Sequence, residues 1–485
     1  MKPLLLPLAL AATLASLPAS ARTLGSLEFT PCELSQPGTG ATTRAECATL
    51  EVPEDPHKPE GRKLTLTVGL AAARAAEPES DPVIFFAGGP GQSATESYPS
   101  MAGAFARLRD KRHVIFVDQR GTGGSHRLAC EFPEDLDTAL ATDPATQTQL
   151  ARDCLAELDA DVAQYTTTVA AGDIEALRQA LGGPRLNLYG GSYGTRVAQE
   201  YARQHPDAVR SIILDGVVPP GLALGSEHSV NLESTLKALL ARCADQPACA
   251  EAFGDPYKRL YALRDQARAI PLAVSLRDPR THQPRELKLD ESAVAGVARL
   301  FAYGPETAAL LPLLVDEALK GRPQSLVAQA ALVYDSLAGM INHGMQLSVI
   351  CAEDAAQLSE REEDAELILG NAIVGVTLNQ CAVWPKGPVS KDFNQPLKTD
   401  TPVLLLSGEL DPVTPPRYAE QVLATLDKAR HLVGQGQGHI LLPRGCTPRL
   451  AADFVDKLDP AGLDASCLDA LGSTPFFINH NGAEP

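Results

Sequence analysis

The segment LNLYGGSYGT, from Leu186 to Thr195, joins a short apolar run to a helical pattern. Its centre, from Gly190 to Gly194, matches the pattern G-x-S-x-G with Ser192 in the middle. A sharp turn from a strand into a helix holds such a serine with its hydroxyl exposed, and the flanking glycines avoid steric clashes. A structural glycine-rich turn is the alternative. The strand before the turn and the helix after it favour Ser192 as a nucleophile.

Four further apolar runs end in turns that contain glycine, at residues 83–86, 113–117, 211–214 and 402–406. Short apolar runs bounded by glycine are typical of parallel strands that are buried on both faces. Helical patterns such as 173–181 lie between several of the runs. This alternation predicts an α/β fold with a mostly parallel sheet flanked by helices.

Leucine- and alanine-rich helical segments interrupt the alternation between residues 221 and 395. Because the strand pattern resumes after them, we interpret 221–395 as a large, mainly helical cap inserted into the fold. Residues 22–220 then form the first part of the core. Residues 396–485 form the second part.

The first 21 residues have the features of a signal peptide. Lys2 provides a positive charge, Leu4 to Leu17 form an apolar run, and Ala19 to Ala21 offer a cleavage site with small residues. A membrane anchor is the alternative, but the run is shorter than the about 20 residues of a bilayer span. We therefore expect export, to the periplasm or the medium, with the mature chain beginning near Arg22. We expect no membrane span after the leader is removed.

The composition limits the classes of partner. The chain has 485 residues, of which 44% are hydrophobic, and a formal net charge of -18. Such acidity disfavours nucleic acid as a partner, because phosphate binding needs clustered lysine and arginine. No phosphate-binding loop, H-E-x-x-H or EF-hand pattern is present, so the sequence predicts no cofactor and no metal site.

The ten cysteines fall into five neighbouring pairs. An even number of cysteines in an exported chain indicates disulfides, and pairing nearest neighbours is the simplest of many connectivities. Zinc binding is the alternative, but no pair has the C-x-x-C spacing of a zinc site. The predicted pairs are Cys32 with Cys47, Cys130 with Cys154, Cys243 with Cys249, Cys351 with Cys381, and Cys446 with Cys467.

A nucleophilic serine needs a histidine as its base. In hydrolases with this strand–turn–helix motif, the base lies late in the chain, after an acidic residue. His439 follows a short strand-like run and meets this requirement. His431 lies inside that run and is interpreted as structural, whereas His480 lies in the tail. His439 is therefore the predicted base.

The histidine in turn needs a carboxylate to orient it and to stabilise its charged form. Asp411 lies in the turn GELDPVTP, directly after the predicted strand 402–406. Glu409 is two residues away, and Asp215 ends an earlier predicted strand, so both are rivals. We expect Asp411 to be the acid.

Two backbone N–H groups are expected to stabilise the oxyanion that forms during attack. The first belongs to Tyr193, which follows the nucleophile. The second is expected from the loop GGPG at residues 88–91, with Gly89 preferred and Gly88 second. Taken alone, GGPG could be any tight turn. Its position before G-x-S-x-G makes it a more specific indication of an oxyanion loop.

Four motifs together resemble the prolyl-aminopeptidase and tripeptidyl-aminopeptidase family of α/β-hydrolases, and most closely its secreted bacterial tripeptidyl aminopeptidases. They are FAGGPG at 86–91, DQRGTGGS at 118–125, NLYGGSYGT at 187–195 and LSGELDPVTP at 406–415. The resemblance extends from about Cys32 to about Cys467. One departure is Ala87, where prolyl aminopeptidases usually have histidine, and it puts strict proline specificity in question.

The resemblance implies a serine aminopeptidase that releases residues or short peptides from substrates with a free N-terminus. Such an enzyme needs an anion to bind the substrate ammonium. Glu353 and Asp354 in CAED are the candidates, because a disulfide from Cys351 would hold them in place. The alternative is that they are simply solvated, as most acidic residues are.

Two other functions remain open at this stage. An esterase or lipase-like hydrolase would use the same three catalytic residues. A non-catalytic binding protein on a hydrolase scaffold would be expected to lack one of them.

Overall fold

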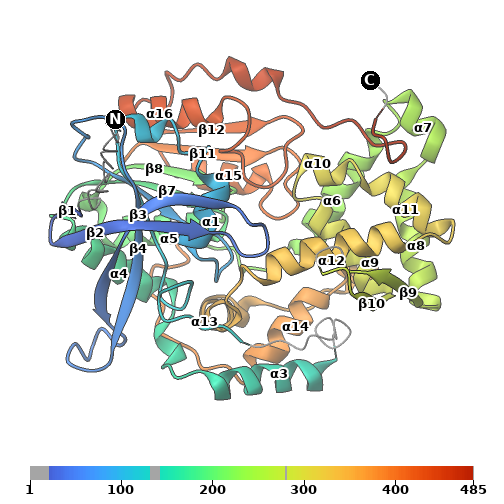
Figure 1. Ribbon diagram of the computed structural model, residues 1–485, viewed down its shortest axis with the longest axis horizontal. Coiled ribbons are helices and arrows are strands. Elements are labelled where there is room, and N and C mark those ends of the chain that lie inside the picture. The colour runs from blue at the N-terminus through green and yellow to red at the C-terminus, as the bar shows by residue number, and fades with distance from the viewer. Residues whose placement is uncertain (1–20, 131–142, 279–280, 484–485) are drawn as a thin grey trace, which may run out of the picture.

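The computed structural model describes residues 21–130, 143–278 and 281–483, so residues 1–20 of the predicted signal peptide lie outside it. Within these residues, ten strands form one sheet in the left half of Figure 1. In spatial order they are β1 (Arg22–Leu24), β2 (Leu27–Ser35), β3 (Thr42–Pro53), β4 (Lys63–Ala71), β6 (Val114–Val117), β5 (Val83–Phe86), β7 (Leu186–Gly191), β8 (Val209–Asp215), β11 (Val403–Gly408) and β12 (Ala429–Gly434).

The strands from β6 to β12 in that spatial order are parallel, and β1 to β4 extend the sheet with antiparallel strands at one edge. The five apolar runs that the sequence singled out correspond to β5, β6, β7, β8 and β11. The predicted α/β fold with a mostly parallel sheet is therefore confirmed. The sequence did not anticipate the size of the antiparallel edge.

Alternate residues of the parallel strands face opposite sides of the sheet, and each side packs against its own helices. In β5, Ile84 and Phe86 join one apolar cluster, whereas Phe85 joins the other. The first cluster includes residues from α4 (Thr167–Ala180), α5 (Tyr193–Gln204) and α15 (Pro416–Leu423). The second includes residues from α1 (Ala94–Met101) and α16 (Thr447–Lys457).

A separate apolar cluster builds the right half of Figure 1. The helical segments expected between residues 221 and 395 include α6, α8 and α12. A two-stranded hairpin, which the sequence did not predict, lies among them. The elements of this half are α6 (His228–Ala241), α7 (Pro247–Phe253), α8 (Pro256–Ala269), β9 (Leu272–Arg277), β10 (Pro284–Leu289), α9 (Glu291–Phe301), α10 (Pro305–Ala308), α11 (Leu311–Leu319) and α12 (Gln324–Ala338).

Two helices from the predicted cap pack mainly with the sheet. Cys351 of α13 (His343–Glu353) and Cys381 of α14 (Ala372–Cys381) are bonded to each other and belong to the first core cluster. Helix α14 also contacts α3 (Pro144–Glu157). We therefore propose that the cap proper extends from α6 to α12, whereas the boundaries at 221 and 395 stay predictions.

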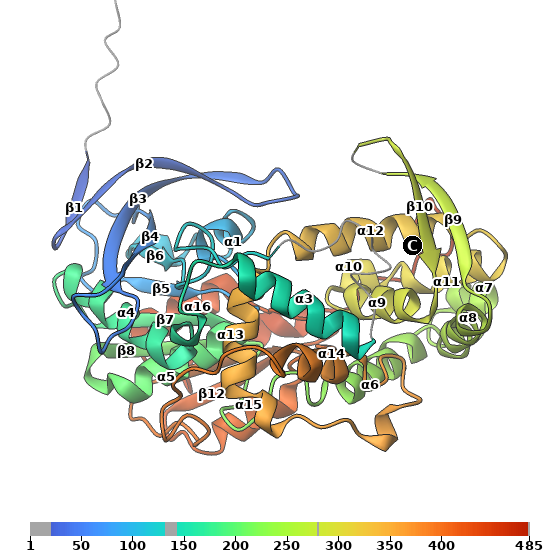
Figure 2. The same ribbon diagram turned by 90° about the horizontal axis from the view of Figure 1, so that it is seen from below.

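The β2–β3 hairpin bends toward the cap, and Figure 2 shows that it and the β9–β10 hairpin project on the same side of the molecule. Gln36, in the turn of the first hairpin, has its side-chain nitrogen 3.1 Å from the sulfur of Met340. The edge hairpin thus contacts the segment that leaves α12.

All ten cysteines are joined in five disulfides, and the pairs are the nearest-neighbour pairs predicted from the sequence. Each closes a loop of 6 to 30 residues. Cross-links of this kind stabilise a fold chiefly by restricting the unfolded chain.

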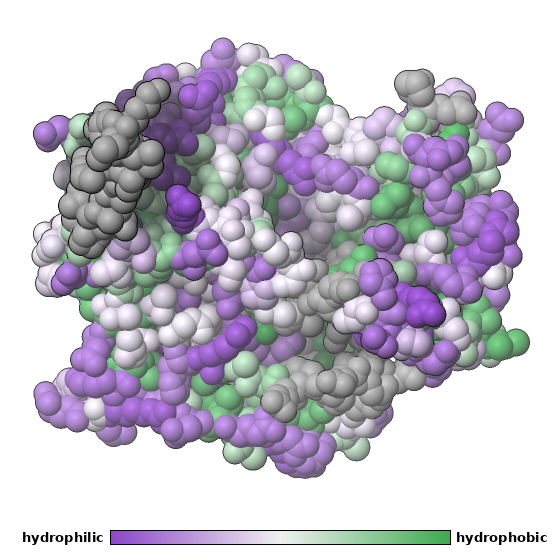
Figure 3. Space-filling model, viewed as in Figure 1, coloured by the Kyte–Doolittle hydropathy of each residue, from purple (hydrophilic) through white to green (hydrophobic). Residues whose placement is uncertain are grey.

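No helix in the described part of the chain is long and apolar enough to cross a membrane. On the face shown in Figure 3, polar residues cover most of the surface, and apolar residues form separate small groups.

A fully buried arginine braces the loop that follows β6. Both the Nε and Nη2 atoms of Arg120 lie 2.7 Å from carboxylate oxygens of Asp173 on α4. Its guanidinium also donates to the backbone carbonyls of Pro53, Glu54 and Gln164. Burying a charge is costly unless it is paired and hydrogen-bonded, and this arginine meets both conditions. The motif DQRGTGGS therefore has a structural role at Arg120.

We expect Asp173→Asn to destabilise the protein by about 3–5 kcal/mol, because it leaves the buried Arg120 without a counter-charge. The urea midpoint measured by circular dichroism checks this. Asp159→Asn is the matched control, since Asp159 pairs with Arg62 at the surface and is 95% exposed. Equal midpoints for the two variants would contradict the assigned role.

Candidate functional site

Ser192 lies in a tight turn between β7 and α5. Its backbone has φ 55° and ψ -124°, a strained conformation for a residue other than glycine. A Cβ at Gly190 would lie 2.2 Å from the carbonyl oxygen of Gly194, and a Cβ at Gly194 would lie 2.3 Å from that of Phe86. Both positions therefore require glycine, because the turn packs directly on its own helix and on β5. The Ser192 N–H donates to the Asp215 carbonyl at 2.8 Å, which holds the turn against β8.

Asp411 and His439 are in direct contact. The Nδ1 of His439 lies 2.7 Å from Asp411 Oδ2, and the carboxylate is fully buried. The other oxygen, Oδ1, accepts the N–H groups of Val413 and Thr414, each at 2.8 Å. The Thr414 hydroxyl donates to Oδ2 at 2.8 Å. The turn DPVT after β11 thus directs the carboxylate at the imidazole.

The electrostatics of this pair favour its ionised form. Burial opposes the charge on Asp411, but the nearby His439 and the hydrogen bonds outweigh it and lower the pKa of the carboxyl group. Burial likewise disfavours the imidazolium, yet the charge of Asp411 and its hydrogen bond raise the pKa of His439 above 6.5. An imidazole with these partners can accept a proton from a serine hydroxyl.

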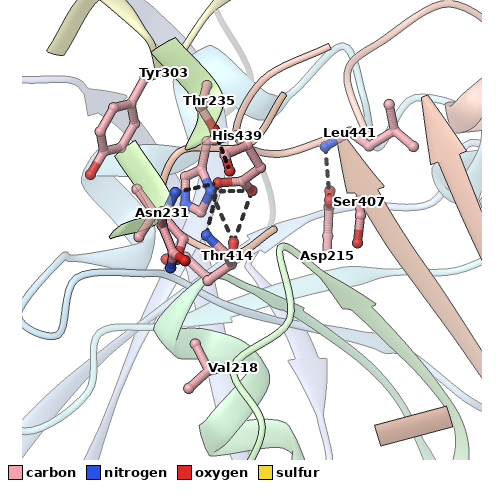
Figure 4. Close-up of polar contacts among 12 residues, drawn as sticks. Asp215, Val218, Asn231, Thr235, Tyr303, Ser407, Thr414, His439 and Leu441 are labelled. Carbon is pink, nitrogen blue, oxygen red and sulfur yellow. Dashed lines mark hydrogen bonds and ion pairs between the residues drawn. The ribbon is translucent and has the colours of Figure 1, made fainter. Parts of the chain in front are cut away.

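Residues of α6 and the segment after α9 contact the segments that carry Asp411 and His439 (Figure 4). Asn231 and Thr235 of α6 donate to backbone carbonyls of the loop that carries Asp411, at 3.0 and 3.3 Å. The carbonyl of Tyr303, just after α9, accepts the His439 N–H at 2.8 Å. The Tyr303 ring meets the imidazole edge-on at 5.3 Å between centroids.

The rival acids hold backbone segments instead. Asp215, fully buried at the end of β8, accepts the N–H groups of Leu441 and Leu442 at 2.8 and 2.7 Å (Figure 4). Burial raises the pKa of Asp215 to about 6, against the effect of these hydrogen bonds. Glu409 accepts the N–H of Gly436 at 2.7 Å. Both carboxylates thus stabilise the loop on either side of His439.

The expected second source of oxyanion donors lies beside the nucleophile. A Cβ at Gly88 would be 3.2 Å from the Cβ of Ser192, which measures how closely the two backbones approach. Gly88 and Gly89 both line the cavity into which Ser192 opens. Tyr193 begins α5 directly after Ser192, and its side chain is buried.

A buried aspartate connects this glycine loop to the motif DQRGTGGS. Asp118 accepts hydrogen bonds from the Ser93 hydroxyl at 2.7 Å and from the backbone and hydroxyl of Thr95 at 2.9 and 2.7 Å. It also accepts the Gly124 N–H at 3.1 Å. Because Ser93 and Thr95 follow GGPG closely, Asp118 fixes where the glycine loop leads into α1.

Ser192 and His439 line a cavity of about 1250 Å³ between the sheet and the helices above it. Its wall includes residues of α9, of α14 and of the segment between α12 and α13. The charged or titratable side chains on the wall, apart from His439, are those of Tyr189, His228, Glu291, Arg299, Tyr303, His343 and Glu360. Among the described residues, no group of three or more potential ligand side chains is arranged to hold a metal ion.

Glu353 and Asp354 are not on this wall, contrary to what an ammonium-binding role requires. Arg196 Nη1 lies 3.0 Å from both oxygens of Asp354 and 3.4 Å from Glu353. Glu353 also accepts the N–H and hydroxyl of Thr167, and that hydroxyl lies 2.7 Å from the Tyr193 hydroxyl. Burial raises the pKa of Glu353 to about 7. The two carboxylates compensate the buried Arg196 and connect α13 to α5, the helix that begins after Ser192.

Glu360 is an acidic residue on the cavity wall that no motif in the sequence marks. Its side chain is exposed and lies over Gly375 of α14, where a Cβ would meet the carboxylate at 2.8 Å. Only the fold brings it to the cavity, since no local motif marks it. Trp384 is buried away from the cavity wall and donates to Ser348 at 3.1 Å, which is a packing role.

Two family models match the chain. The model described as alpha/beta hydrolase fold matches residues 81–240, which include Ser192 and the motifs FAGGPG and DQRGTGGS. The TAP-like protein model matches residues 367–467, which include Asp411 and His439.

Similar proteins carry peptidase names. Serine protease Hip1 of Mycobacterium tuberculosis is 26% identical over 464 residues, covering 84% of this chain and 85% of the relative. Tripeptidyl aminopeptidase of Streptomyces coelicolor is 30% identical over 192 residues, covering 36% of this chain and 35% of the relative. The crystal structure of proline iminopeptidase from Mycobacterium smegmatis covers 84% of this chain and 98% of its own, with 17% identity and a TM-score of 0.40. The chain therefore has the α/β-hydrolase fold with a TAP-like carboxyl-terminal part, and it is similar to proteins named tripeptidyl aminopeptidase and serine protease Hip1.

Proposed function

We propose that this protein is an exported serine aminopeptidase, which releases residues or short peptides from free N-termini through an acyl-enzyme. The observation that carries the proposal is the buried contact between Asp411 and His439 at the cavity into which Ser192 opens. The peptidase names of the relatives support the reaction class. The five disulfides support export to an oxidising compartment.

Each residue has one task in the proposed mechanism. The Ser192 hydroxyl attacks the scissile carbonyl while His439 accepts its proton and then delivers it to the leaving amine. Asp411 keeps the imidazole oriented and stabilises its charged form. The N–H groups of Tyr193 and Gly89 stabilise the oxyanion, with Gly88 as the alternative donor. Water then attacks the ester carbonyl of the acyl-enzyme while His439 accepts its proton, and His439 returns this proton to the Ser192 oxygen as the ester bond breaks.

We further propose Glu360 as the group that binds the substrate ammonium. It is an acidic residue on the cavity wall, and it forms no ion pair with any described residue. Glu291, the other acidic residue on that wall, already forms a bidentate pair with Arg268 at 2.6 and 2.7 Å. An ammonium at Glu360 would gain a counter-charge without displacing an existing one.

A free amine is therefore expected to matter for catalysis. We expect kcat/KM for a tripeptide anilide to exceed that for its N-acetylated twin by about tenfold or more, because acetylation removes the charge that an anion binds. Release of the aniline measures both rates. Equal rates would exclude the aminopeptidase and leave an esterase or an endopeptidase.

Glu360→Gln and Glu353→Gln are expected to behave differently. The first should reduce the preference for the free amine about fivefold, since an exposed ion pair contributes up to about 1 kcal/mol. The second should lower the melting temperature, because it removes a buried partner of Arg196 and Thr167, and should leave the preference unchanged. The opposite pattern would restore Glu353 as the ammonium-binding group.

The acid limb of the pH profile should depend on Asp411. Because the base must be neutral and Asp411 raises the pKa of His439, kcat/KM should fall as the pH drops through a value above 6.5. Asp411→Asn removes the counter-charge, so the limb should move to lower pH while the plateau falls by about 10⁴-fold.

A fluorophosphonate that labels Ser192 in the wild type separates this enzyme from a non-catalytic binding protein, which it would leave unlabelled.

A further inference from the structure

A cation without a counter-charge lies on the cavity wall near the proposed base. Arg299 of α9 lines the cavity, and its Nη2 lies 3.3 Å from the hydroxyl of Tyr303. No carboxylate among the described residues forms an ion pair with it. Two other arginines of the cap are paired, because Arg268 contacts Glu291 and Arg259 contacts Asp316.

Tyr303 connects this guanidinium to His439. The backbone carbonyl of Tyr303 accepts the N–H of His439, and the Tyr303 ring meets the imidazole edge-on. Burial, and next the charge of Arg299, hold the pKa of His228 well below its ordinary value. The same charge acts against protonation of His439. Arg299 therefore gives the cavity wall a positive charge, and the lowered pKa of His228 on the same wall favours its neutral form.

The charges of the cavity favour a ligand with an anionic group on this side. Among the described residues that line it, the carboxylates are those of Glu291, which is already paired, and of Glu360. A guanidinium offers a rigid fork of donors that matches a carboxylate, and such charge-assisted hydrogen bonds are stronger than neutral ones. A carboxylate bound there would compensate the cation and leave Glu360 free for the substrate ammonium.

We propose that Arg299 is a specificity-determining residue that binds a substrate carboxylate next to the scissile bond. The inference rests on the proposed peptidase function and names the class of substrate for the same site. The carboxylate can come from an acidic side chain before the scissile bond or from the C-terminus of a short peptide. Both sources present the same group to the guanidinium.

Two matched pairs of free-amine substrates separate the sources. Ala-Ala-Glu and Ala-Ala-Gln p-nitroanilides differ only in the carboxylate of the side chain. Tetra-alanine and its C-terminal amide differ only in the terminal carboxylate, and mass spectrometry follows their cleavage. In each pair the ratio of kcat/KM values cancels any change in the pKa of His439.

We expect Arg299→Gln to lower the ratio of charged to neutral substrate about tenfold in one pair, and that pair identifies the source. Arg299→Lys should retain part of the preference, because it keeps the charge but not the fork. Arg322→Gln is the matched control, since Arg322 is an exposed arginine that pairs with Glu317 away from the cavity. It should leave both ratios unchanged.

Unchanged ratios in both pairs for Arg299→Gln, with cleavage intact, would overturn the assignment while leaving the peptidase standing. A wild type that cleaves none of the four substrates would instead count against the proposed function. Protection of Ser192 from fluorophosphonate labelling then tests Arg299 directly. Ala-Ala-Glu-amide should protect the wild type more than Ala-Ala-Gln-amide does, and equal protection would also overturn the proposal.

Discussion

The close contact between the nucleophile turn and strand β5 is the constraint on which the rest of the site depends. Glycines at 190 and 194 let the turn approach its own helix and the carbonyl of Phe86 at distances that any Cβ would prevent. Ser192 then has a strained backbone, held by the hydrogen bond from its N–H to the Asp215 carbonyl. Strain of this kind persists only where the surroundings over-determine it. The parallel sheet provides that rigidity, since β7 is buried between β5 and β8.

Around this turn, buried carboxylates have structural roles, and two of them, Asp215 and Glu353, were candidates for functional roles in the sequence. Asp118 fixes the loop after GGPG, Asp215 holds the segment after His439, and Glu353 compensates Arg196. Each replaces lost hydration with several hydrogen bonds or an ion pair, as buried charges must. Asp411 differs in one respect, because one of its partners is an imidazole that faces the cavity. The same chemical group thus either braces the fold or orients a base.

The cavity combines groups from parts of the chain that are far apart. Glu360 comes from the segment before α14, Arg299 from α9 in the cap, and Ser192 from the core. The cap also holds the loop of Asp411 through Asn231 and Thr235. The cap therefore lines the cavity and also supports the loop of Asp411, so changes in the cap are expected to affect both binding and turnover.

The sequence alone determined the features that depend on local spacing. Apolar runs ending in glycine predicted the parallel strands, G-x-S-x-G predicted the turn at Ser192, and the order of the cysteines predicted all five disulfide pairs. Only the tertiary structure decided which groups each carboxylate contacts. Glu353 was expected at the substrate and is buried against Arg196, whereas Glu360 went unnoticed and lines the cavity. The physical reason is that carboxylates are alike in chemistry, and their surroundings, formed by residues distant in the chain, set their role.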